Sequence, residues 1–423
     1  MRLDMDKVLL HTPEGVRDIY ASEMEKKVTI TDNIHKVFRR NGFRDIQTPM
    51  FEYFDIFNKE RGSVASKNMY KFFDREGYTL VLRPDMTPSI ARCAAKYYTD
   101  TKSPIRFCYN GNTFINNAEH QGKLKEFTQM GCELISDNSS DADADMIAVL
   151  VESLLEAGLR DFKISIGEAG FYKGLIEECN IDEETEDQLT QMIVNKNNFG
   201  MEDILDGKGI EQKYKDMFMK LPELFGGIEV LEKADDITDV KKSEKSLERL
   251  RKVYDILKIY GLEEYVSFDL GMISYYKYYT GIIFNAYTYK TGDAIATGGR
   301  YDNLLAQFGK NAPAIGFAIN VDTLMTALMR QNIEIKNDDE NVCVLFKHFN
   351  RKVAIDLAKV LRSKGINVSL TRKSSSIDDE VYLNGAKEDG NTKAYYILNN
   401  TDMCIYDLAN DKKEEVKIDT YLN

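Results

Sequence analysis

The chain has 423 residues, which is enough for two or three domains with cores of their own. Its 56 Lys and Arg against 69 Asp and Glu give a net charge of −13, which argues against a large nucleic-acid footprint. The cysteines form no CxxC pair and the histidines have no metal-ligand spacing, so we predict no metal site and no cofactor. Without a signal peptide or a long apolar run, the chain is expected to be soluble, cytoplasmic and free of membranes.

The N-terminal quarter predicts a helix followed by short strands. Apolar residues recur at helical spacing across 30–38, and Asn41-Gly42 is typical of a helix end. A strand is expected over 43–51, and two more over 70–73 and 79–82. The sequence RPDMTP at 83–88 then predicts a turn that caps a helix.

Residues 106–135 predict two strands joined by a polar loop. In the second strand, alternation places Gln129 and Glu133 on the same face. Polar residues on the face of a central strand indicate a lined cavity. A surface hairpin with one wet face is the more common origin of such a pattern, and both interpretations stay open on the pattern alone.

The remaining chain alternates between helical and strand-rich segments. The acidic run 137–145 is expected to cap a helix, and 172–262 is helical with little strand. A strand pair over 266–289 carries SYYKYY, and 297–324 contains GGRYD followed by AIGFA. The last segment alternates strands and helices, which predicts a small α/β domain.

The order and spacing of these motifs resemble those of histidyl-tRNA synthetases, which are class II synthetases. The resemblance implies an α+β fold, with a class II synthetase-like antiparallel sheet flanked by helices, formed by residues 1–171 and 263–335. It also implies a helical insertion over 172–262 and a C-terminal α/β domain over 340–423. The helix and proline-ended strand near the N-terminus resemble motif 1, the dimer interface of this class.

The resemblance also implies a pocket for histidine. In the family, an acid and a threonine equivalent to Asp85 and Thr87 hold the amino group. The residues hypothesised to line the pocket are Asp85, Thr87, Gln129, Glu133, Tyr279 and Tyr301.

The family's ATP-binding arginines are missing at three matched positions. Ile115 replaces the motif 2 arginine, Ser274 the histidine-specific one and Thr323 that of motif 3. A guanidinium binds phosphate oxygens bidentately, which isoleucine, serine and threonine cannot do. Because removing one transition-state donor typically costs ~10²–10³ in rate, we expect no useful adenylation.

The combination of a retained histidine pocket and missing ATP-binding arginines resembles the regulatory subunits of ATP phosphoribosyltransferase, which are paralogues of the synthetase. This resemblance implies a non-catalytic chain in the first step of histidine biosynthesis, with no tRNA. The chain would form a homodimer, and it would bind the short-form catalytic subunit within a larger hetero-oligomer. Histidine would act as a feedback effector, either in the inherited pocket or at a subunit interface.

Two alternatives belong to other classes. A divergent but active histidyl-tRNA synthetase would let Lys123 or Lys125 replace a lost arginine, although lysine lacks the bidentate fork. A stand-alone amino-acid or RNA-binding module would merely reuse the fold.

Overall fold

The computed structural model describes residues 10–57, 64–117, 123–273, 278–335, 340–410 and 412–422. The chain divides into two compact units. One comprises residues 1–17 and 30–334, and the other residues 18–29 and 335–423. No helix among the described residues is both long enough and apolar enough to cross a membrane.

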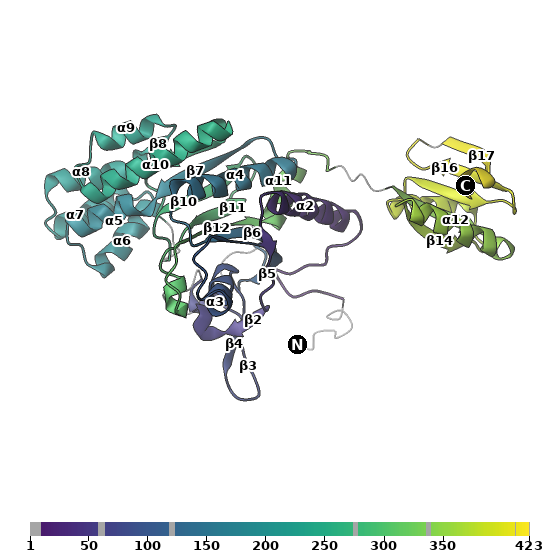
Figure 1. The fold of residues 1–423 in the computed structure, drawn as a ribbon, viewed down its shortest axis with the longest axis horizontal. Coiled ribbons are helices and arrows are strands. Elements are labelled where there is room, and N and C mark those ends of the chain that lie inside the picture. The colour runs from purple at the N-terminus through teal and green to yellow at the C-terminus, as the bar shows by residue number, and fades with distance from the viewer. Residues whose placement is uncertain are drawn as a thin grey trace, which may run out of the picture. The chain divides into compact units, whose positions relative to one another are not determined.

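A nine-stranded sheet forms the larger unit (Figure 1). Its strands are antiparallel except for the pairs β1–β5 and β7–β9, which are parallel. This arrangement confirms the predicted class II synthetase-like sheet. In order across the sheet the strands are β1 (Arg44–Asp45), β5 (Ile105–Phe114), β6 (Glu126–Ile135), β12 (Ala314–Asn320), β11 (Ala296–Arg300), β10 (Ile282–Thr288), β7 (Phe162–Glu168), β9 (Val266–Asp269) and β8 (Phe225–Gly226).

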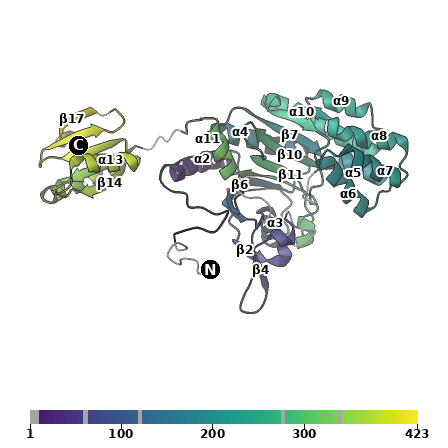
Figure 2. The same cartoon turned by 180° about the vertical axis from the view of Figure 1, so that it is seen from behind.

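Helices cover this sheet on both sides (Figures 1 and 2). α2 (Ala21–Arg40), α4 (Ser140–Glu156) and α11 (Val321–Arg330) lie on one side. α3 (Thr87–Tyr97) lies on the other, beside a small antiparallel sheet of β2 (Phe51–Tyr53), β4 (Thr79–Leu82) and β3 (Lys71–Phe73). The buried apolar side chains of α4 are typical of a helix packed into a core.

The segment between β7 and β9 is helical, as predicted from its apolar stripes. Leu247, Leu250, Val253 and Leu257 of its last helix are all buried. This helix packs on α4 and on the first helix of the segment, so the segment and the sheet share one unit. The helices are α5 (Ala169–Glu178), α6 (Glu183–Val194), α7 (Asn198–Gly207), α8 (Gln212–Lys220), α9 (Glu229–Asp235) and α10 (Lys241–Tyr260).

The C-terminal segment forms a five-stranded sheet in the order β14-β13-β15-β16-β17, with β13 parallel to both neighbours. Its core includes Val342, Val344 and Leu357. The elements are β13 (Asn341–Phe346), α12 (Arg351–Ser363), β14 (Asn367–Arg372), α13 (Asp379–Glu388), β15 (Lys393–Ile397), β16 (Asp402–Asp407), β17 (Lys412–Lys417) and α14 (Asp419–Leu422).

The continuous strand expected over 43–51 was wrong. The structure has the two-residue β1 and then, after a gap, β2. In that gap the carbonyls of Thr48 and Pro49 accept hydrogen bonds from the buried guanidinium of Arg83, at 2.9 and 3.4 Å. A distant side chain therefore satisfies backbone groups that a strand ladder would otherwise pair.

Candidate functional site

Small residues on the central strands make room for a cavity on the face that α3 borders. Gly316 of β12 pairs with Glu133 of β6, and Gly299 of β11 pairs with Gly316. A Cβ atom on Gly316 would lie 1.7 Å from Oε2 of Glu133, and one on Gly299 would lie 2.7 Å from the Tyr279 ring. The carboxylate and the ring therefore occupy space that only glycine leaves open.

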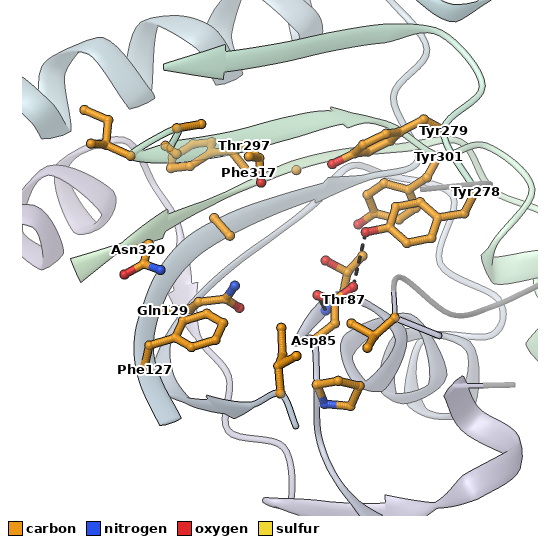
Figure 3. Close-up of a pocket in the computed structure, with 18 residues that line it drawn as sticks. Asp85, Thr87, Phe127, Gln129, Tyr278, Tyr279, Thr297, Tyr301, Phe317 and Asn320 are labelled. Atoms are coloured by element: carbon orange, nitrogen blue, oxygen red, sulfur yellow. Dashed lines mark hydrogen bonds between the residues drawn. The ribbon is translucent and has the colours of Figure 1, made fainter. Parts of the chain in front are cut away.

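The cavity has a volume of about 190 Å³, which suits a small molecule rather than a single water (Figure 3). The predicted residues Asp85, Thr87, Gln129, Tyr279 and Tyr301 all line it. They come from the loop before α3 and the first residue of α3, from β6, and from segments flanking β10 and β11. Five hypothesised residues, up to 216 positions apart in sequence, thus meet at one place.

Glu133, the sixth hypothesised residue, lies directly behind the cavity wall. It is 1% exposed, and its carboxyl group accepts hydrogen bonds from the Tyr301 hydroxyl at 2.5 Å and the Thr87 hydroxyl at 2.8 Å. Burial raises the pKa of Glu133 to about 8, although these two hydrogen bonds act to lower it. The group therefore holds its proton at neutral pH and orients two side chains that do reach the cavity.

The carboxylate of Asp85 is fixed in position at the start of α3. It accepts hydrogen bonds from the Tyr278 hydroxyl and from the backbone N–H of Thr87, both at 3.2 Å (Figure 3). Because Thr87 is the first residue of α3, the carboxylate also lies at the positive end of a helix. Tyr278 was not among the hypothesised site residues, although it precedes Tyr279 in the same motif and lines the cavity.

Gln129 carries an unsatisfied hydrogen-bond acceptor. Its Oε1 atom is buried and has no hydrogen-bond partner among the described residues. Leaving a buried acceptor unpaired costs roughly 1–3 kcal/mol. Figure 3 shows the Gln129 side chain extending into the cavity, so a bound N–H donor would relieve this cost.

Apolar side chains also line the cavity. They belong to Phe127, Ile295, Phe317 and Ile115, the residue that the sequence analysis matched to the motif 2 arginine. No lysine or arginine occurs among the described residues that form the lining. Two polar lining residues were missed by the sequence analysis, Thr297 and Asn320. Asn320 pairs with Gln129 across β12 and β6, but sequence alone does not give this register.

The other replaced positions differ in their surroundings. Thr323 lies in the first turn of α11, where its backbone N–H bonds to Oδ1 of Asn320 at 3.0 Å, and it does not line the cavity. Ser274 lies outside the described residues. Lys123, a proposed substitute for arginine, pairs with Asp293 at 3.2 Å, and neither it nor Lys125 lines the cavity.

A buried ion-pair network lies next to the site. Arg300 is 2% exposed and donates to Oδ1 of Asp143 from Nη2 at 2.6 Å. Arg249 of α10 donates to the other oxygen of Asp143 from Nε at 2.7 Å. Burial raises the pKa of Asp143, and both arginines oppose that shift. The predicted cap of α4 by the run 137–145 is confirmed, since Ser139 is the N-cap and Asp141 and Asp143 lie in the first turn, while Asp143 also forms this buried ion pair.

Comparison with known proteins gives consistent results. The histidyl-tRNA synthetase family model matches residues 15–324. An ATP phosphoribosyltransferase regulatory subunit of Acetivibrio thermocellus is 37% identical, and the match covers 98% of each chain. The crystal structure of an ATP phosphoribosyltransferase regulatory subunit/histidyl-tRNA synthetase from Bacillus halodurans is 33% identical, with a TM-score of 0.80, covering 89% of this chain and 96% of that one.

A second solved structure supports the fold alone. Histidyl-tRNA synthetase from Nostoc sp. PCC 7120 has a TM-score of 0.81 and is 20% identical, with 97% of each chain covered.

Proposed function

This chain belongs to the family of ATP phosphoribosyltransferase regulatory subunits, which share the histidyl-tRNA synthetase fold, and from this premise we propose that it is a non-catalytic subunit of such a transferase. It would associate with the short-form catalytic chain and carry no aminoacylation or tRNA-binding activity. The phosphoribosyl transfer, a glycosyltransferase reaction, would take place on the partner. We further propose that free histidine is the effector.

The composition of the cavity carries this proposal. The lining includes Asp85 and the unsatisfied carbonyl of Gln129, both suited to an ammonium group. It also includes Ile115 and other apolar side chains, and its described residues include no lysine or arginine that could serve as the guanidinium a synthetase needs for the triphosphate. Such a pocket can hold an amino acid without activating it.

Regulation requires that histidine bind two states of the assembly with different affinities. The chain around the site is suited to this, since Arg300, directly before Tyr301, forms a buried ion pair with Asp143 of α4, and Arg249 of α10 contacts the same carboxylate. A shift of Tyr301 on ligand binding would act on α4 and α10 together.

The test is a phosphoribosyltransferase assay of the catalytic chain with and without this protein, titrated with histidine. We expect activation by the wild-type chain and inhibition by histidine, with the inhibition weakened at least tenfold by Asp85→Asn. The exposed variant Gln188→Met serves as a matched control and should behave as wild type. An absence of activation would contradict the assembly, and histidine-dependent ATP–pyrophosphate exchange by the isolated chain would favour the active-synthetase alternative.

A further inference from the structure

A second and larger cavity lies farther along the same sheet face. Its volume is about 700 Å³, within the range of small-molecule sites. Its floor is formed by β7, β9, β10 and β11, and residues of α6 and the segment around β8 form its walls. Of the residues that line the first cavity, it shares only Tyr279 and Thr297, so the two spaces are neighbours with a common wall.

The floor carries a row of short polar side chains. The strand register places Thr297 opposite Asn285, Asn285 opposite Ser165, and Ser165 opposite Ser267. Adjacent strands are ~4.8 Å apart, so this row extends for roughly 14 Å. The hydroxyl groups of Thr297, Ser165 and Ser267 make no hydrogen bond within the described part of the chain, so they remain available to a ligand.

Two residues of opposite charge, Asp269 and Lys196, line this cavity. Asp269, at the end of β9, accepts the backbone N–H of Gly271 at 3.0 Å and is half-buried. Lys196 follows α6, where its ammonium lies 5.8 Å from the centroid of the Phe225 ring. Burial raises the pKa of Asp269, although the hydrogen bond from the Gly271 N–H and the positive charge of Lys196 act to lower it. Among the described residues, no ion pair joins the two groups, although both face the cavity.

This arrangement matches the charge pattern of a zwitterion. The ammonium group of the ligand can pair with the partly desolvated carboxylate of Asp269. The carboxylate of the ligand can pair with the ammonium group of Lys196. The apolar wall formed by Ile193, Val194 and Met272 would contact a side chain. We infer that this cavity is a second ligand site, for a small zwitterion of the α-amino-acid class held between Asp269 and Lys196.

Calorimetry on the full chain tests this inference without the catalytic subunit. L-Histidine is titrated first, and then each of the other nineteen L-amino acids is titrated into histidine-saturated protein. We expect either a second histidine per chain or another amino acid binding with a Kd below about 1 mM. That binding should weaken at least tenfold in Asp269→Asn and in Lys196→Gln.

The variants separate this site from the first. Asn keeps an oxygen for the Gly271 N–H, and Lys196 is exposed, so both variants are expected to fold. Lys213→Gln, at an exposed lysine of the same helical segment, should bind as wild type. Binding lost in Asp85→Asn belongs to the first cavity and tests the proposed function. The inference is overturned if no amino acid binds beyond the first site, if Asp269→Asn and Lys196→Gln leave the second binding event unchanged, or if ribose 5-phosphate binds there in place of amino acids.

Discussion

At the scale of single residues, burial and hydrogen bonding have opposite effects on the pKa of Glu133. Burial favours the neutral acid, whereas the hydroxyl groups of Tyr301 and Thr87 donate to the carboxyl oxygens and favour the anion. Burial has the larger effect. Asp85, at the cavity surface, adds repulsion in the same direction. The Glu133 carboxyl group is thus a neutral support for two side chains that line the cavity.

Glu133→Gln should change the pH dependence of stability. Between its ordinary value of 4.5 and about 8, the folded wild-type chain holds a proton that the unfolded chain has released. The free energy of unfolding therefore falls as pH rises, with about 1.4 kcal/mol per pH unit from this group. The variant lacks this contribution, so it should gain stability relative to wild type from pH 5 to pH 8 in urea denaturation. Glu248→Gln, at an exposed site, should leave the slope unchanged. Parallel curves for wild type and Glu133→Gln would contradict the assignment.

Gln129→Met should raise the stability of the ligand-free chain and weaken histidine binding. The substitution removes a buried acceptor without a partner, so we expect about 1 kcal/mol of added stability in the ligand-free chain. Histidine affinity should fall at least tenfold by calorimetry, because the carbonyl is lost. Gln188→Met, at an exposed position, is the control for the methionine itself. A destabilised variant that binds histidine normally would refute a ligand-directed role.

At the scale of elements, the network of Arg300, Asp143 and Arg249 joins β11, α4 and α10. These elements lie far apart in sequence, and one buried carboxylate connects all three. Removing one partner of a buried pair leaves an uncompensated charge, which is why such changes cost more than losing a surface pair.

Arg300→Leu should therefore destabilise the chain by ~3–5 kcal/mol in urea denaturation. Arg300→Leu combined with Asp143→Asn should recover part of that loss, because it also replaces the buried carboxylate that would otherwise keep only Arg249 as its ionic partner. Arg40→Leu, which breaks the exposed pair with Glu156, should cost no more than ~1 kcal/mol. Equal losses in the single and double variants would show that packing, rather than charge, dominates at this position.

At the scale of the whole molecule, exposed apolar side chains indicate a surface for association. Met50 and Phe51 are 54% and 53% exposed, and they follow the segment that resembles motif 1. Clustered apolar groups on a surface are typical of protein interfaces. We predict that they are covered in a homodimer, the state that the resemblance to class II synthetases implies.

Analytical ultracentrifugation measures directly whether the chain forms a homodimer. The wild-type chain of 48.4 kDa should sediment with twice that mass, and Phe51→Ser should shift the population toward monomer. Phe199→Ser, at an 85% exposed position of the helical segment, should leave the mass unchanged. A monomeric wild-type chain would contradict the prediction.

The sequence by itself determined the helices with apolar stripes, the strand pairs, the family and five of the residues that line the first cavity. These follow from local periodicity and from the order of motifs, which depend on near neighbours along the chain. The tertiary structure decided that Glu133 lies behind the wall, that Gln129 lacks a partner, and that Asp143 is buried between two arginines. It also produced the second cavity. Each of these depends on groups brought together from distant segments, as with Glu133 and Tyr301, which are 168 positions apart, and local patterns carry no information about such contacts.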